Sequence, residues 1–157
     1  MFNANDNGGF MAFAARADYP AYAGDATPVE TWTALSSNPS AQLVDVRTQA
    51  EWAFSGIARL DSVSKNVKMI SWKFYPNFDV NPRFIEQLEA AVPDKSTPLY
   101  FLCKTGGRSA DAAIAATAAG YSECYNIEGG FEGDINSNHQ RGQVNGWKAA
   151  RLAWQQA

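Results

Sequence analysis

The stretch Leu99-Tyr100-Phe101-Leu102-Cys103-Lys104-Thr105-Gly106-Gly107-Arg108-Ser109 decides the fold predicted for this chain. Its first four residues are apolar and predict a short buried strand, and the alanine-rich residues 110–119 predict a helix that ends at Gly120. The glycine pair indicates a tight loop. A buried strand that passes through a tight loop into a helix is typical of an α/β protein, and it places Cys103 at the mouth of the helix.

Cys103 is a candidate nucleophile because of this position. The first N–H groups of a helix have no partner within it, and with the helix dipole they favour a nearby thiol as the thiolate. Gly106 and Gly107 let the backbone form a nest of N–H groups, and Lys104 and Arg108 add positive charge. The alternative is that Cys103 is a small core residue and Arg108 a solvated residue of the helix surface. The neighbouring residues favour chemistry on sulfur.

Strands and helices alternate on both sides of this stretch. Capping boxes at Thr27–Glu30 and Thr48–Glu51 predict where two helices begin, the first ending near Ser36. Strands are predicted over residues 42–46, 67–70, 99–102 and 123–127, and further helices over residues 81–92, 108–119 and 147–154. This alternation predicts a parallel α/β sheet covered on both faces. Ligands bind such sheets beyond the carboxyl ends of the strands, where Cys103 lies.

Length and composition limit the class of protein. A chain of 157 residues forms one domain, and we expect a loosely held arm over residues 1–26 before a domain over residues 27–157. The net charge of −3 argues against nucleic-acid binding. No apolar run approaches the roughly 20 residues that span a membrane, and no secretory signal is recognisable, so we expect a cytoplasmic protein. The two cysteines and single histidine lack the spacing of a zinc site, and no cofactor is expected.

The spacing between Cys103 and Arg108 separates two kinds of anion chemistry. Cysteine phosphatases place the arginine six positions after the cysteine, whereas here it follows after five. The shorter loop makes a tighter ring of N–H groups, which suits a persulfide or one sulfur of thiosulfate better than a phosphoryl group. A cysteine protease needs a base beside its thiol, and the only histidine, His139, lies in a polar segment that predicts a surface loop. We therefore place sulfur transfer first and a cysteine phosphatase or arsenate reductase below it.

Several segments together resemble a single-domain rhodanese. They are Leu43-Val44-Asp45-Val46-Arg47-Thr48, Glu51-Trp52, Cys103 to Ser109, Asn126-Ile127-Glu128-Gly129-Gly130-Phe131 and Asn145-Gly146-Trp147-Lys148-Ala149-Ala150. The resemblance runs from about Thr27 to the end of the chain and departs at Ser55-Gly56-Ile57, where many relatives carry Gly-His-Ile. It implies a rhodanese-like α/β fold, with a five-stranded parallel sheet and helices on both faces, and sulfurtransferase activity.

The resemblance also implies roles for the residues of the loop. Cys103 would be the catalytic nucleophile, which takes a sulfane sulfur from a small anionic donor and passes it from a persulfide to a thiol or cyanide acceptor. The substrate-binding cradle would be the backbone of Lys104, Thr105, Gly106, Gly107, Arg108 and Ser109, with the Lys104 and Arg108 side chains attracting the donor. Neither nucleic acid nor membrane is an expected partner.

Three further features have structural and functional interpretations. The aromatic run at residues 72–78 is either core or a rim where a protein acceptor docks, which leaves a persulfide carrier or binding module as an alternative function. Cys124 lies in an apolar strand and is expected in the core; the sequence leaves open the alternative that it resolves a persulfide on Cys103. Asp45 is expected to accept loop hydrogen bonds, and Arg47 to pair with Glu51 or with Asp45; the alternative is that the two residues face the cleft and contact the substrate.

Overall fold

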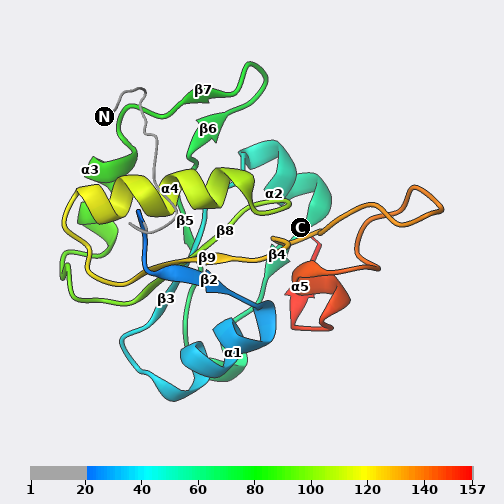
Figure 1. Cartoon of the computed structure of the whole chain (residues 1–157), viewed down its shortest axis with the longest axis horizontal. Helices are drawn as coiled ribbons and strands as arrows, with labels where there is room; N and C mark the ends of the chain where they lie inside the picture. The colour runs from blue at the N-terminus through cyan, green and yellow to red at the C-terminus, as the bar shows by residue number, and fades with distance from the viewer. Residues whose placement is uncertain (1–20, 157) are drawn as a thin grey trace.

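A central parallel sheet organises the computed structural model, which describes residues 21–156. Its strands are β2 (Gly24–Ala26), β3 (Gln42–Asp45), β5 (Lys68–Met69), β8 (Leu99–Leu102) and β9 (Cys124–Ile127). They form a five-stranded sheet in the order β2-β9-β8-β3-β5, and every pairing in it is parallel (Figure 1). The predicted α/β architecture is confirmed, and the strand that leads to Cys103 is the central one.

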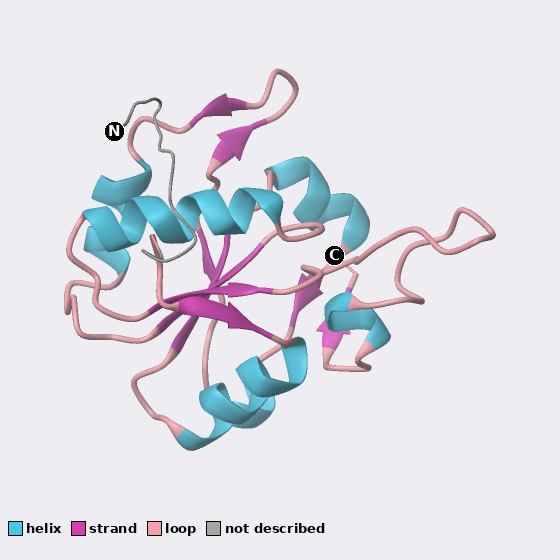
Figure 2. Cartoon of the chain, viewed as in Figure 1, coloured by secondary structure: helices cyan, strands magenta, loops and turns pink. Residues whose placement is uncertain are grey.

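Helices cover both faces of this sheet (Figure 2). They are α1 (Pro28–Ser37), α2 (Gln49–Ser55), α3 (Phe84–Ala91), α4 (Gly107–Ala118) and α5 (Gly146–Ala149), with a short 3₁₀ helix at Asp61–Val63. Successive residues of β8 point to opposite faces, so Phe101 packs in the core that includes α3 and α4, and Leu102 in the core that includes α1 and α5. This double burial explains the uninterrupted apolar sequence of the strand.

The capping boxes that the sequence predicts are both present. In α1 the Thr27 side chain accepts from the Glu30 N–H while the Glu30 side chain accepts from the Thr27 N–H, and Pro28 occupies the first turn. The same exchange between Thr48 and Glu51 begins α2. The second box matters for the site, because it fixes the Glu51 carboxylate at the carboxyl end of the sheet.

Two small antiparallel sheets lie beside the main one. The pair β6 (Lys73–Phe74) and β7 (Asp79–Val80) forms a hairpin from the aromatic run, and β4 (Ile57–Ala58) pairs with β10 (Trp154–Gln155). The helix predicted over residues 147–154 is wrong in its second half. Arg151 adopts a φ of 63°, which ends the helix. Residues 154–155 instead pair with β4 as a strand, and no local sequence pattern predicts this pairing.

The boundary expected after residue 26 also needs correction. Residues 1–20 lie outside the described part of the chain, but Gly24, Asp25 and Ala26 are not an arm. They form β2, paired in register with residues 125–127 of β9. A three-residue strand with one apolar side chain is too short to show an alternation of apolar and polar residues. It can therefore be identified only from its pairing with the neighbouring strand. Within residues 21–156 no helix is long and apolar enough to cross a membrane.

Candidate active site

The candidate nucleophile lies beneath a loop that joins β8 to α4. Cys103 directly follows β8, and Gly106 takes a φ of 115°, a left-handed conformation that only glycine adopts readily, immediately before α4 begins. The Gly106 N–H donates to the Cys103 Sγ at 3.1 Å. Because Cys103 is 1% exposed while Thr105 and Gly107 are exposed, the sulfur sits at the bottom of the loop.

Four other backbone N–H groups of the loop make no hydrogen bond in the described part of the chain. Within residues 21–156, the backbone N–H groups of Lys104, Thr105, Gly107 and Arg108 donate to no protein acceptor. Unpaired N–H groups at a helix N-terminus form an anion site by geometry and by dipole. Of the predicted cradle residues, Gly106 is the one whose N–H donates to the Cys103 sulfur in the described part of the chain, and the cradle as a whole stays a prediction.

The loop carbonyls are held from the opposite side by the glycine-rich segment after β9. The Cys103 carbonyl accepts from the Phe131 N–H at 2.7 Å, and the Lys104 carbonyl accepts from the Glu132 N–H at 3.0 Å. Gly130 makes this approach feasible, because a Cβ there would lie 2.5 Å from the Lys104 carbonyl carbon. These bonds hold the Cys103 and Lys104 carbonyls against the segment after β9.

A chain of side-chain hydrogen bonds runs from the sulfur to the edge of the sheet. The Ser109 Oγ lies 3.1 Å from the Cys103 Sγ and 2.6 Å from the Asn126 Oδ1. The Asn126 Nδ2 donates to the Asp25 Oδ1 at 3.2 Å, and the Tyr22 hydroxyl donates to the same oxygen at 2.9 Å. Burial, together with this bond to Asp25, raises the pKa of Tyr22 to about 12, so it remains a donor. Sequence reasoning missed Asp25 altogether and gave Asn126 no role beyond its place in a motif.

Arg108 is paired with a carboxylate rather than unpaired. Its guanidinium donates to both oxygens of Glu51, at 2.7 and 2.8 Å, and lies over the Phe78 ring at 5.6 Å. Burial acts to raise the pKa of Glu51, but the bonds from Arg108 and Thr48 outweigh it, and the pKa is lowered. Burial acts to lower the pKa of Arg108, but Glu51 raises it overall. The expected attraction of a donor by the Arg108 side chain would therefore compete with Glu51.

Lys104 is the other cation of the loop. Its side chain is partly buried, and no ion pair with it occurs in the part of the chain that the structure describes. Of the two predicted cations, Lys104 thus has the more available charge.

The buried pair of Asp45 and Arg47 supports the end of β3. Both side chains are fully buried, and the Arg47 Nη2 lies 2.7 Å from the Asp45 Oδ2. Asp45 also accepts from the Arg47 backbone N–H, and the Arg47 Nη2 donates to the Gly56 carbonyl. Of the two partners expected for Arg47, Asp45 is therefore the right one, because Glu51 is occupied by Arg108. Both side chains are enclosed in the fold, and the structural role expected of them stays a prediction.

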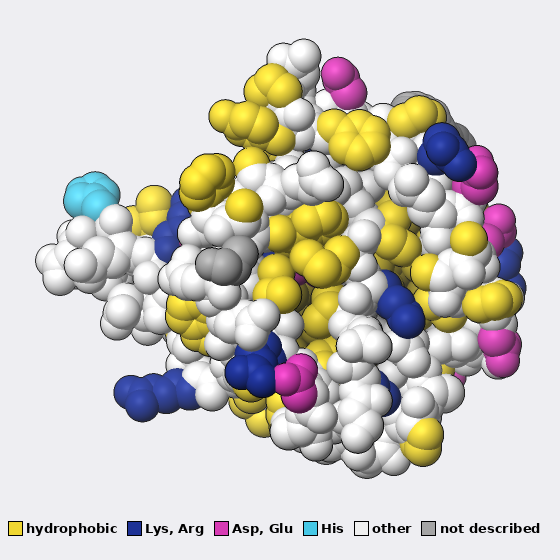
Figure 3. Space-filling view, turned by 180° about the vertical axis from the view of Figure 1, so that it is seen from behind, with side chains coloured by type: hydrophobic (Ala, Val, Ile, Leu, Met, Phe, Trp, Pro, Cys, Tyr) yellow, Lys and Arg dark blue, Asp and Glu magenta, His cyan; other side chains and the backbone are white. Residues whose placement is uncertain are grey.

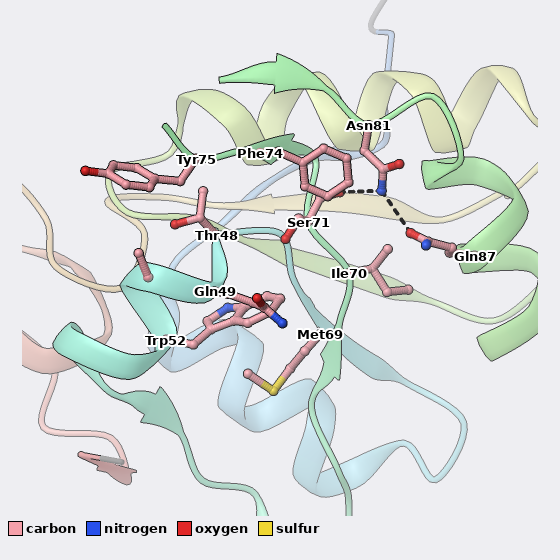
Figure 4. A pocket seen from close by; sticks show the side chains of 11 residues that line it. Thr48, Gln49, Trp52, Met69, Ile70, Ser71, Phe74, Tyr75, Asn81 and Gln87 are labelled. Atoms are coloured by element: carbon pink, nitrogen blue, oxygen red, sulfur yellow. Dashed lines mark hydrogen bonds between the residues drawn. The ribbon is translucent and has the colours of Figure 1, made fainter. Parts of the chain in front are cut away.

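A cavity of about 700 Å³ opens at the carboxyl ends of β3 and β5. Its lining is uncharged and includes Thr48 and Trp52 of the α2 region, Phe74 of the hairpin, and Asn81, whose amide bonds Gln87 (Figure 4). Seen from behind, hydrophobic side chains gather across the middle of the molecule (Figure 3). Cys103 does not line this cavity, and nothing in the sequence pattern located it.

Two other residues considered in the sequence analysis, Cys124 and His139, lie outside the candidate site. Cys124 is buried in the core, and burial raises the pKa of its thiol. His139 is exposed in a loop, where its backbone N–H donates to the Asn136 carbonyl. Neither contacts the Cys103 sulfur.

Comparisons of this chain with family models, related sequences and solved structures agree on one family. The sequence model of the rhodanese-like domain matches residues 27–136. An uncharacterized protein of Rickettsia conorii is 43% identical over 122 residues, covering 77% of this chain and 88% of that protein. The thiosulfate sulfurtransferase GlpE of Tolumonas auensis is 30% identical over 105 residues, covering 67% of this chain and 82% of that protein. The crystal structure of Rv0390 from M. tuberculosis aligns with a TM-score of 0.79 and 41% identity, covering 87% of this chain and 99% of that one. This chain belongs to the rhodanese-like domain family.

Proposed function

We propose that this protein is a sulfurtransferase that moves a sulfane sulfur from a thiosulfate-like anion to a thiophilic acceptor through a persulfide on Cys103. The observation that carries the proposal is the loop itself: the Gly106 N–H donates to the Cys103 sulfur, and four neighbouring backbone N–H groups have no protein acceptor among residues 21–156. The likeness to a thiosulfate sulfurtransferase supports the same substrate class.

The first half-reaction transfers sulfur to the protein. The Cys103 thiolate attacks the outer sulfur of thiosulfate, an S–S bond forms to Sγ, and the S–S bond of thiosulfate breaks with its electron pair leaving on sulfite. The negative charge then resides on the outer sulfur of the persulfide. Unpaired N–H groups of the loop stabilise charge at that place, as preorganised donors do where charge develops.

The second half-reaction regenerates the Cys103 thiolate. Cyanide or a thiolate attacks the outer sulfur, the bond between that sulfur and Sγ breaks, and its electron pair returns to Sγ as the thiolate. Neither step needs an added oxidant or reductant. A general base is also unnecessary once the thiolate has formed, in keeping with the exposed position of the only histidine.

The test combines turnover with intact mass. Wild-type protein incubated with thiosulfate should gain the mass of one sulfur atom and release it to cyanide as thiocyanate. Cys103→Ala should do neither, whereas Cys124→Ala, the matched buried thiol, should do both. Thiocyanate formation by Cys103→Ala at the wild-type rate would refute the proposal. Hydrolysis of a phosphoester that Cys103→Ser abolishes would instead support a phosphatase.

A second candidate function is a persulfide carrier or a binding module for a partner protein. It is favoured by the hairpin, where Phe74, Tyr75 and Phe78 are 47%, 64% and 43% exposed, more than core packing requires. Phe78 also touches Arg108 and so adjoins the loop. Poor turnover of thiosulfate, together with partner capture that Phe74→Ser abolishes, would favour this function.

A further inference from the structure

The cavity at the carboxyl ends of β3 and β5 is not used by the proposed sulfur transfer. Its volume of about 700 Å³ lies within the range of roughly 300–1,000 Å³ found for pockets that bind small organic molecules. Among the described residues that line it, none is Asp, Glu, Lys, Arg or His, and Cys103 does not contribute to the lining. A thiosulfate-like anion would find no opposite charge there, so the cavity suits an uncharged ligand.

Aromatic side chains from two elements form part of the cavity wall. Trp52 belongs to α2 and Phe74 to the hairpin of β6 and β7, and Tyr75 follows Phe74 (Figure 4). Met69 at the end of β5 adds a thioether. Aromatic rings and thioether sulfur atoms both make favourable contacts with another aromatic ring. The wall therefore suits a ligand that is flat and aromatic.

A buried amide at the cavity wall has an orientation that the backbone fixes. The Asn81 Nδ2 donates to the Ser71 carbonyl at 2.9 Å, and the Asn81 Oδ1 accepts from the Arg83 N–H at 2.9 Å. A backbone carbonyl only accepts and a backbone N–H only donates, so the nitrogen and the oxygen of the Asn81 amide cannot exchange places. The same Nδ2 also donates to the Gln87 Oε1 at 2.8 Å.

This last bond orients the Gln87 amide in turn. Its oxygen faces Asn81, so its nitrogen is the end that remains for a ligand. Within residues 21–156 the Gln87 Nε2 donates to no protein acceptor, and the side chain of Gln49, which also lines the cavity, makes no hydrogen bond. The wall thus combines a hydrogen-bond donor of fixed orientation from α3 with an adaptable amide from α2.

We propose that this cavity is a binding site for an uncharged, flat aromatic compound that carries a hydrogen-bond acceptor such as a carboxamide oxygen. The aromatic ring packs against Trp52 and Phe74, and the acceptor receives a hydrogen bond from the Gln87 Nε2. Asn81 is a positioning residue, because it keeps the Gln87 oxygen turned away from the ligand. This site goes beyond the proposed function, whose sulfur donor is an anion, and it adds a second class of ligand.

The experiment compares two probes of nearly the same shape by isothermal titration calorimetry on the full chain. Naphthalene-2-carboxamide is neutral, whereas 2-naphthoate is charged. We expect saturable binding of the amide, and binding of the carboxylate weaker by about tenfold or more, because the carboxylate loses hydration without meeting an opposite charge. Equal affinities for the two probes, or no saturable binding of the amide, would overturn the proposal.

The donor at the wall is tested by a change that keeps the shape of the side chain. Gln87→Glu retains an oxygen facing Asn81 but replaces the nitrogen donor by an acceptor, and it should weaken binding of the amide by about tenfold. Ala90→Glu is the control, because it adds the same charge at an exposed position of α3 that does not line the cavity. Unchanged binding in Gln87→Glu, or an equal loss in Ala90→Glu, would refute the assigned role of the donor and with it the proposal.

The aromatic wall is tested by a second matched pair. Phe74→Ser should weaken binding of the amide several-fold through loss of a ring contact, whereas Phe54→Ser, on α2 but outside the lining, should not. Both rings are exposed, so both variants should fold, and equal affinities in the two would count against the site. Cys103→Ala should bind the amide as the wild type does. A failure of sulfur transfer is therefore distinguishable from a failure of this site.

Discussion

At the scale of single residues, the ion pair of Glu51 and Arg108 makes the stability of the fold depend on the ionisation of the Glu51 carboxyl. The pKa of Glu51 is below its ordinary value of 4.5, because hydrogen bonds from Arg108 and Thr48 outweigh the opposing effect of burial. A carboxyl whose pKa is lowered by folding stabilises the fold above its unfolded pKa. That contribution disappears as the pH falls through the folded pKa.

We therefore expect Glu51→Gln to lower the free energy of unfolding at pH 7 by roughly 1–3 kcal/mol, since the pair is mostly but not fully buried. Below pH 4.5 the wild-type protein should lose stability more steeply than this variant. Urea unfolding at several pH values measures both effects. Glu86→Gln is the control, because its pair with Arg83 is exposed and should change stability less. Equal pH slopes for Glu51→Gln and the wild type would contradict the interpretation.

Gly130 is a second residue whose identity is fixed by a close approach. Its φ is +62°, and an added Cβ would fall 2.5 Å from the Lys104 carbonyl carbon and 2.6 Å from the Cys103 carbonyl oxygen. Gly130→Ala should lower the free energy of unfolding by more than about 2 kcal/mol, from backbone strain and displacement of the loop.

The matched glycine for this prediction is Gly107. It lies in the first turn of α4, and a Cβ there meets nothing within 4 Å, so Gly107→Ala should leave stability nearly unchanged or raise it. Thermal unfolding of the two variants provides the comparison. Similar losses in both would show that the loop does not depend on the contact at Gly130.

At the scale of elements, two helices begin with the same capping box but differ in what the box supports. Thr48 bonds Glu51, which holds Arg108 beside the cradle, whereas Thr27 bonds Glu30 away from the site. Thr48→Val and Thr27→Val should each cost about 1 kcal/mol of stability through loss of the cap. We expect only Thr48→Val to change the KM for thiosulfate. Equal effects on KM would mean that α2 does not position the cation.

At the scale of the whole molecule, the position of each strand in the sheet predicts its protection from amide exchange. The central strand β8 is bonded to β9 on one side and to β3 on the other, and its residues pack into both cores. Strands β2 and β5 lie at the edges. Native-state hydrogen exchange should be slowest in β8 and faster in β2 and β5, because edge strands open with fewer broken contacts. Faster exchange in β8 than in β2 would contradict this order.

The sequence by itself determined the elements that are specified locally. Two capping boxes, each formed by bonds within four residues, predict where α1 and α2 begin: Thr27 with Glu30, and Thr48 with Glu51. The apolar run at Leu99–Leu102 followed by the glycine pair announces the central strand and the loop over Cys103. Each of these signals lies within a few consecutive residues, where backbone preference and burial suffice to predict the structure.

Only the tertiary structure decided the contacts between residues distant in sequence. Asp25 reaches Asn126 across 101 positions, and Glu51 reaches Arg108 across 57, so no local pattern could show which polar groups surround the sulfur. Strand β2 and the end of the chain take their conformation from neighbouring strands rather than from their own residues. The sequence located the candidate nucleophile, Cys103, but the fold determined its hydrogen-bond partners, because a buried polar group must bond to whatever packing brings beside it.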